Sequence, residues 1–115
     1  MKVLVKEPGK PYEFREIEKT LEAMQAIVGG YIEVISLRWA GTVLVCDEEG
    51  CLKNYEPNAV VRTATKSPQQ IVGTFFVCQT AGGKFVGFND SREAGMLAAT
   101  FSVYEFGEYQ RKEWL

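Results

Sequence analysis

The stretch from Leu21 to Leu37 constrains the fold more than any other part of the chain. Thr20 is a residue type that caps helices, and Gly29 can adopt the left-handed conformation that ends one. The apolar residues that recur at helical spacing between them are Leu21, Met24, Ile27 and Val28. Residues 31–37 follow directly with the pattern of a strand. The domain therefore combines a short helix with a sheet, and we expect the apolar face of the helix to pack in the core.

Strand-like segments occupy much of the rest of the chain. The sequence predicts further strands at residues 2–6, 12–17, 42–46, 51–53, 71–79 and 84–88. Short turn-rich connections favour antiparallel hairpins between sequence neighbours, and Gly50 is expected to supply a positive φ in the turn at 47–50. Residues 71–79 lack clean alternation, which favours a central strand buried on both faces. Gly73 inside it is expected to permit a bulge or a close backbone approach.

A second helix is predicted near residues 91–104. Asp90 and Glu93 have the spacing of a capping signal. The residues expected on its apolar face are Ala94, Leu97, Ala98 and Phe101. We therefore expect an α+β fold, a mainly antiparallel sheet with two helices packed on it, near residues 20–28 and 91–104.

The length of 115 residues suits a single domain, 1–115, whose end at 108–115 is expected to fray. The formal net charge of −2 is too small for the electrostatic attraction on which most nucleic-acid binding rests. No apolar run is long enough to span a membrane, and the start of the chain does not read as a secretion signal. The expected location is the cytoplasm.

Familiar catalytic and metal-binding constellations are missing from the sequence. The chain has no histidine, so a nucleophilic triad lacks its usual base, and its three cysteines have no zinc-ligand spacing. Cys46 and Cys51 flank the turn at 47–50, where a disulfide is geometrically conceivable but a reducing cytosol favours free thiols. Asp47–Glu49 can be a cation-binding loop or a solvated hairpin tip, and the second interpretation is favoured. We expect no cofactor and no metal.

Candidate binding residues lie on the strand after the helix and in an irregular loop. Alternation places Tyr31 and Glu33 on the same strand face, and Asn58 follows a proline in the least regular part of the chain. An amide that can donate and accept, beside a carboxylate and a tyrosine, is suited to recognition. The hypothesis is a binding site formed by Tyr31, Glu33 and Asn58. The alternative, an ordinary polar strand face, remains open.

Several segments together resemble a known but uncharacterised family. They are residues 21–37, Val45–Gly50, Pro57-Asn58 and Ile71–Val77. The family is a domain of unknown function whose members occur largely in phages, conjugative elements and Gram-positive gut bacteria. The resemblance implies a nonenzymatic accessory protein of a mobile genetic element that binds a host protein or a small ligand. The alternative is a small enzyme or regulator that uses a carboxylate-lined cleft. The identity of the partner and the oligomeric state stay open.

Overall fold

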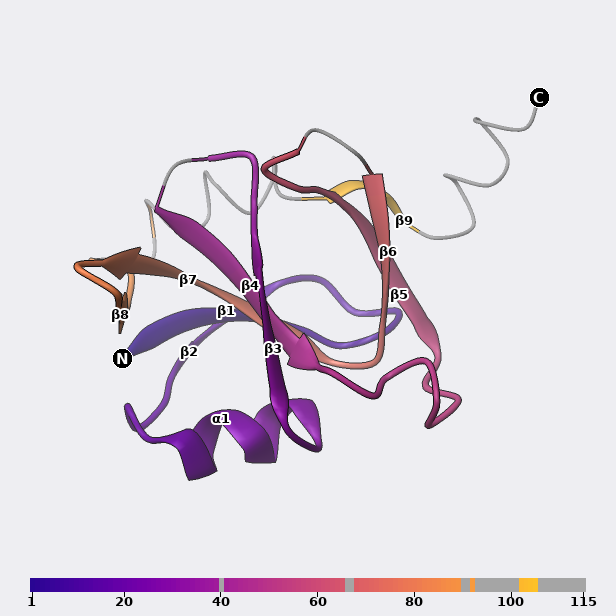
Figure 1. Cartoon of the computed structure of the whole chain (residues 1–115), viewed down its shortest axis with the longest axis horizontal. Coiled ribbons are helices and arrows are strands. Elements are labelled where there is room, and N and C mark those ends of the chain that lie inside the picture. Colours follow the sequence, from indigo (N-terminus) through magenta and orange to yellow (C-terminus); the bar gives the residue numbers. More distant parts are fainter. Residues whose placement is uncertain (40, 66–67, 90–91, 93–101, 106–115) are drawn as a thin grey trace.

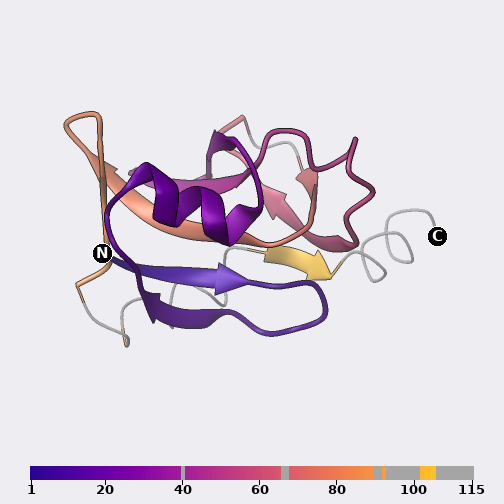
Figure 2. The same cartoon turned by 90° about the horizontal axis from the view of Figure 1, so that it is seen from below.

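The fold has three layers: a helix, a large antiparallel sheet and a small antiparallel sheet (Figure 1). The structure is a computed structural model that describes residues 1–39, 41–65, 68–89, 92 and 102–105. The helix α1 (Leu21–Val28) lies against one face of the large sheet, and the small sheet covers the other face. Figure 2 shows α1 from below, in front of the large sheet.

The large sheet has six strands, all antiparallel to their neighbours. They are β1 (Lys2–Lys6), β2 (Glu13–Glu16), β3 (Ile32–Ser36), β4 (Thr42–Asp47), β7 (Phe75–Ala81) and β8 (Lys84–Val86). Their order is β2-β1-β7-β4-β3, and β8 pairs with the end of β7. The hairpins β1–β2, β3–β4 and β7–β8 confirm the predicted pairing of sequence neighbours.

The small sheet contains β5 (Pro57–Arg62), β6 (Pro68–Val72) and β9 (Ser102–Glu105), in the order β6-β5-β9. It meets the large sheet at one corner, where Leu37 and Thr63 form an isolated antiparallel bridge. There the Ala64 amide donates to the Ser36 carbonyl over 2.9 Å, and the Arg38 amide donates to the Arg62 carbonyl over 3.2 Å. The two sheets are therefore joined at the end of β3 and diverge from that point.

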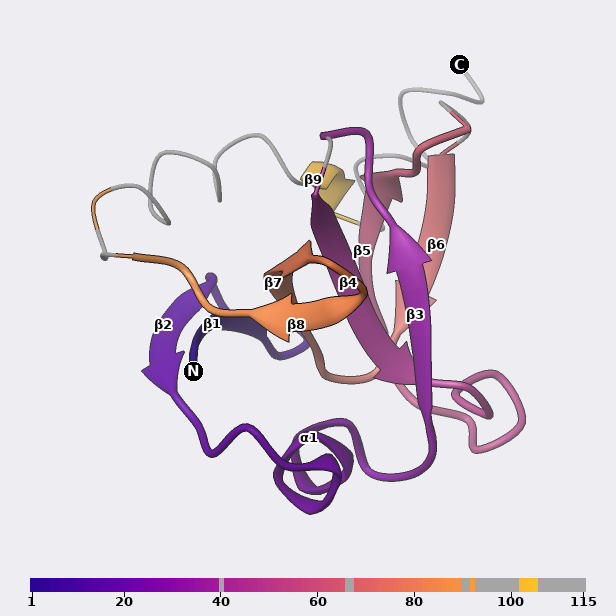
Figure 3. The same cartoon turned by 60° about the vertical axis from the view of Figure 1, so that its left-hand side comes forward.

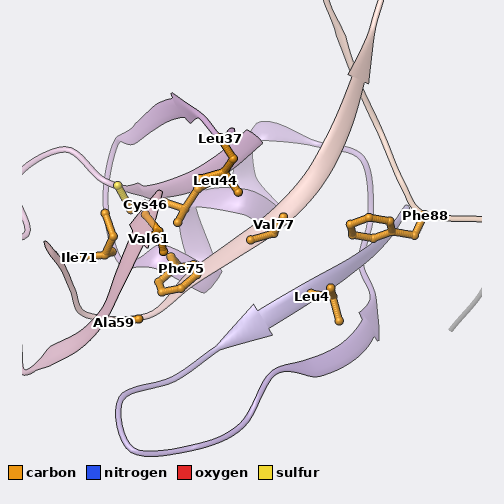
Figure 4. Close-up of a cluster of buried hydrophobic side chains, with 10 residues drawn as sticks. All are labelled: Leu4, Leu37, Leu44, Cys46, Ala59, Val61, Ile71, Phe75, Val77 and Phe88. Atoms are coloured by element: carbon orange, nitrogen blue, oxygen red, sulfur yellow. The ribbon is translucent and has the colours of Figure 1, made fainter. Parts of the chain in front are cut away.

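Strand alternation divides the core into two clusters. On β7, Phe75 and Val77 face the small sheet, whereas Phe76 and Cys78 face α1. The cluster between the sheets is shown in Figure 4 and contains Leu4, Leu37, Leu44, Cys46, Ala59, Val61, Ile71, Phe75, Val77 and Phe88. The expectation of a central strand buried on both faces is thus confirmed for β7.

The helix α1 begins and ends as its sequence indicates. The Thr20 hydroxyl accepts from the Ala23 amide over 3.1 Å, and Gly29 closes the helix with φ of 93°. Met24 and Val28 are buried against the large sheet, whereas Leu21 is 50% exposed. The apolar stripe therefore packs as predicted from Met24 to Val28, but not at Leu21.

The predicted second helix is not supported. Of residues 91–104, residues 102–104 belong to strand β9, which pairs with β5, and residues 91 and 93–101 lie outside the described residues. Leu97 and the tail 108–115 also lie outside them. A strand is reasonable at Val103-Tyr104 because β-branched and aromatic residues favour pleated pairing, and tertiary contacts override a weak helical period. Among the described residues, α1 is the one helix with defined ends.

Two predicted strands also differ from the structure. Residues 71–79 divide into β6 and β7, because Gly73, with φ of 76°, turns the chain from one sheet into the other. Residues 51–53 form turns in place of a strand, and Gly50 does not have a positive φ. The segment after β4 is therefore a compact loop and not a hairpin arm.

Candidate binding site

A buried carboxylate organises the loop that follows β4. Asp47 is the last residue of β4, and its side chain is 1% exposed. Its Oδ2 accepts hydrogen bonds from Lys53 Nζ at 2.8 Å and from Tyr55 Oη at 3.0 Å. Its Oδ1 accepts from the Glu49 amide at 2.9 Å. The expectation that Asp47–Glu49 is a solvated tip is therefore wrong for Asp47, while Glu48 and Glu49 are exposed.

The end of α1 packs directly against this carboxylate. Lys53 Nζ also donates to the Gly29 carbonyl over 3.1 Å. A Cβ on Gly30 would lie 2.6 Å from Lys53 Nζ and 2.8 Å from Asp47 Oδ2, although Gly30 has no positive φ. Gly29 ends the helix, and Gly30 leaves room for the ion pair. The Gly-Gly sequence thus serves two separate purposes.

The pKa shifts in this cluster follow from its hydrogen bonds. Burial alone would raise the pKa of Asp47, but the bonds from Lys53, the Glu49 amide and Tyr55 outweigh it and lower the pKa. The hydrogen bond to Asp47 raises the pKa of Lys53 and is also the main cause of the raised pKa of Tyr55. At neutral pH, Asp47 is therefore ionised, Lys53 is protonated and Tyr55 is neutral.

A depression with a volume of about 540 Å³ lies between α1 and the loop 47–55. Its lining includes Glu22, Gln25 and Ala26 from α1, then Gly29, Gly30 and Tyr31, and finally Glu49 and Lys53. Tyr31 is 68% exposed. The volume lies within the range of about 300–1,000 Å³ that is usual for small-molecule sites. A second depression of about 310 Å³ borders the other side of Gly29 and includes Tyr55.

A second buried polar group joins β1 to the small sheet. Lys6 is 2% exposed and Asn58 is 1% exposed. Asn58 Oδ1 accepts from Lys6 Nζ at 2.9 Å, and Asn58 Nδ2 donates to the carbonyls of Lys6 and Gly73 at 2.9 and 2.8 Å. A buried amide with this many partners stabilises the local structure. The strand β1 itself is buried on both faces from Val3 to Lys6.

The three sequence-predicted site residues lie in different surroundings. Tyr31 lines the 540 Å³ depression. Glu33 is exposed and lines a separate cavity of about 70 Å³ between the end of β4 and β6, where its Oε1 lies 3.7 Å from Cys46 Sγ. Asn58 is buried beside Lys6. Tyr31 thus has the exposure of a binding residue, whereas the contacts of Asn58 are internal.

The cysteines are free thiols. Cys46 and Cys78 are buried, and Cys51 is exposed. Burial raises the pKa of Cys78 to about 12, and burial together with Glu33 raises the pKa of Cys46 to about 12. Both buried thiols are therefore protonated at neutral pH and are poor nucleophiles.

The Asp47–Lys53–Tyr55 cluster was missed from the sequence. Its three polar residues stand in a loop without a motif, and the acidic run resembled a hairpin tip. One signal was present: a helix needs a single glycine to end, so a second glycine at Gly30 indicates a close approach by another group. The strand β5 around Asn58 was also missed from the sequence, which placed Asn58 in an irregular loop, although the apolar run Ala59–Val61 is a signal for a buried strand.

Fold and site together define a small α+β domain with two antiparallel sheets and with shallow depressions beside the end of α1. Residues 1–101 match the family described as "Domain of unknown function (DUF3846)", and the chain belongs to this family. No curated protein and no solved structure matches the chain.

The described part of the chain contains neither a membrane-spanning helix nor a cluster of metal-binding side chains. Within it, no helix has the length and apolar character needed to cross a membrane. Among the same residues, no three His, Cys, Asp or Glu side chains gather in a way that could hold a metal ion.

Proposed function

We propose that the protein is a nonenzymatic accessory protein of a mobile genetic element, which binds a host protein or a small ligand. The setting in phages, conjugative elements and Gram-positive gut bacteria, and action in the cytoplasm, are parts of this proposal. The observation that carries it is the depression of about 540 Å³ between α1 and the loop 47–55. We assign the binding contact to this depression, with Tyr31 at its edge.

The local structure supports a site that is rigid before the ligand arrives. The Asp47–Lys53 pair fixes the loop 47–55 to the Gly29 carbonyl at the end of α1. Tyr31, in contrast, exposes 68% of its surface beside this fixed wall. An exposed aromatic side chain on a rigid scaffold is a common anchor in binding sites, because little entropy is lost when it is covered.

The titration behaviour favours binding over catalysis. An effective general acid or base has a pKa near the working pH. The shifted pKa values in the described residues move away from neutrality: downward for Asp47, and upward for Lys53, Tyr55 and the two buried thiols. The Asp47–Lys53–Tyr55 cluster is therefore suited to fixing the conformation of the loop 47–55, with charges that do not change near neutral pH.

The test is affinity capture of the tagged protein from its native host, with mass spectrometry of the bound proteins and small molecules. We expect Tyr31→Ala to lose the captured component while its melting temperature stays unchanged, because Tyr31 is mostly exposed. Val86→Ala is the matched control, since Val86 is a partly exposed apolar residue on β8, outside the lining of the depression. A folded Tyr31→Ala variant that captures as much as Val86→Ala would refute this site.

The alternative, an enzyme or regulator with a carboxylate-lined cleft, has a narrower basis. Glu33, Asp47 and Glu48 line one cavity, but its volume is about 70 Å³. That is below the usual range of ligand sites, and Asp47 is already paired with Lys53. Glu33→Gln, compared with wild type for turnover of any captured small molecule, tests it directly.

A further inference from the structure

The outer edge of β3 carries backbone groups that the described strands leave without a pairing strand. Within the described residues, β4 is the strand that pairs with Ile32–Ile35. The Tyr31 carbonyl accepts from the Glu48 amide, and the Leu37 amide donates to the Thr42 carbonyl. The backbone amides and carbonyls of the odd-numbered residues of β3 therefore point toward β4. The Ser36 carbonyl and the Arg38 amide bond to residues 62–64 on the opposite side. By alternation, the amides and carbonyls of Ile32 and Val34 therefore point away from β4.

The other sheet edges with described side chains are protected, in contrast to β3. Three of the four residues of β2 are charged, β6 begins with Pro68, and β8 has three residues. Charges, proline and short length are the usual protections of sheet edges against pairing with another chain. In β3, three of five residues are apolar and β-branched, and Val34 is 46% exposed. Figure 3 shows β3 at the outer margin of the large sheet.

We propose that β3 is a docking edge that accepts an extended segment of a second protein as an additional strand beside Tyr31–Ile35. The added strand would exchange backbone hydrogen bonds with Ile32 and Val34. Its length is limited at one end, because residues 62–64 already occupy the position beside Ser36 and Arg38. The paired part of the partner is therefore about five residues long.

The charges around this edge determine the chemistry of the partner segment. The partner residue opposite Glu33 would stand in a non-hydrogen-bonded pair, where facing side chains are closest. Glu33 and Glu48 are both exposed and line the same small cavity, together with the amides Gln69 and Gln70. A lysine or arginine at the central position of the segment meets this set of carboxylates favourably. The partner is thus an extended segment with a basic residue between residues suited to strands.

A second copy of this chain fits the edge less well. In one antiparallel register, Ile32 of each copy pairs with Val34 of the other. This register places the two Glu33 side chains opposite each other, and like charges in that position are unfavourable. A shift that pairs Val34 with Val34 places the second copy beside Ser36, whose carbonyl already accepts from Ala64. Neither of these two registers, which engage Val34 of both copies, is favourable, and this favours a segment of a different protein.

The experiment uses a library of nine-residue peptides displayed on yeast, selected against the folded full-length chain. We expect the selected peptides to place a basic residue between β-branched or aromatic residues, and to slow hydrogen exchange at the amides of Ile32 and Val34. Val34→Pro removes one outward amide from the edge and should weaken binding roughly fivefold or more, the effect of one hydrogen bond. Val34→Thr keeps the amide and a β-branched side chain, and it should bind like wild type.

A second measurement leaves the protein unchanged, so that a folding defect in Val34→Pro does not decide the result. Single N-methylation along the best peptide should abolish binding at alternate positions and be tolerated at the positions between them, because only every second amide faces β3. The proposal is overturned by a selection without binders, by equal effects at both sets of positions, or by slowed exchange at α1 and the loop 47–55 in place of β3. Slowed exchange at α1 and the loop 47–55 would still support the proposed binding site in the depression between them.

Discussion

Asn58 connects three parts of the fold from a position with 1% of its surface exposed. Its amide bonds to the Lys6 side chain, to the Lys6 carbonyl and to the Gly73 carbonyl. These contacts join β1, β5 and the connection between β6 and β7. At the scale of single residues, a buried amide of this kind contributes to stability mainly because its removal would leave buried donors and acceptors without hydrogen-bond partners. Its proposed role in recognition thus competes with a structural role that the geometry favours.

We expect Asn58→Ala to lower the free energy of unfolding by about 2–4 kcal/mol, because buried groups that lose a hydrogen-bond partner each cost about 1–3 kcal/mol. Urea denaturation measures the change. Gln70→Ala is the control, since Gln70 is an exposed polar residue on the neighbouring strand β6, and it should stay within about 0.5 kcal/mol of wild type. An Asn58→Ala variant as stable as Gln70→Ala would mean that Asn58 is free to serve binding.

The helix α1 is the element that the sequence specified best, because its signals are local. The Thr20 cap, the apolar spacing and the Gly29 end all act within one turn of the residues that they organise. Its packing is less uniform than the apolar pattern alone indicates. Met24 is 6% exposed against the large sheet, whereas Leu21, three residues earlier on the same stripe, is half exposed.

This difference gives a matched pair of substitutions on one helix. Met24→Ala should destabilise the protein by about 2–5 kcal/mol, the usual cost of emptying a core position. Leu21→Ala should change stability by less than about 0.5 kcal/mol, as is usual for a surface position. Thermal or urea denaturation of both variants measures the contrast. Equal costs for the two variants would contradict the packing of α1 on the large sheet.

For the molecule as a whole, the sequence predicted the hairpins β1–β2, β3–β4 and β7–β8, but neither the hairpin β5–β6 nor the way the strands assemble. Pairs such as β3–β4 depend on a short turn and on alternation, which are visible in the chain. The pairing of β7 with both β1 and β4, and of β9 with β5, joins segments that are far apart in the sequence. Local pattern does not encode these pairings, and in the same way it missed Asp47, whose partners Lys53 and Tyr55 depend on how the loop folds back.

The ionisable cluster at Asp47 connects stability to pH. The pKa of Asp47 is lower in the folded chain than the ordinary value of 3.8, so folding favours the ionised form. This contribution is fully present above pH 3.8 and is lost as the pH falls through the lower, folded pKa. Lys53 and Tyr55 have the opposite sign. The contribution of Lys53 is fully present below pH 10.5 and that of Tyr55 below pH 10.0. Each is lost as the pH rises through the raised pKa of the folded chain.

Asp47→Asn should therefore remove one specific part of the acid sensitivity. At neutral pH we expect it to lower the free energy of unfolding by about 1–3 kcal/mol, the cost of losing charged hydrogen bonds at a buried position. The difference from wild type should begin to shrink below about pH 3.8, because Asp47 of the unfolded chain then becomes protonated, and it should vanish only below the lowered pKa of the folded chain. Urea denaturation between about pH 7 and pH 3 measures both curves. Glu48→Gln, which removes an exposed neighbouring charge, should run parallel to wild type over this range. If the gap between Asp47→Asn and wild type stays constant down to the lowest pH, the carboxylate of Asp47 does not carry the acid sensitivity.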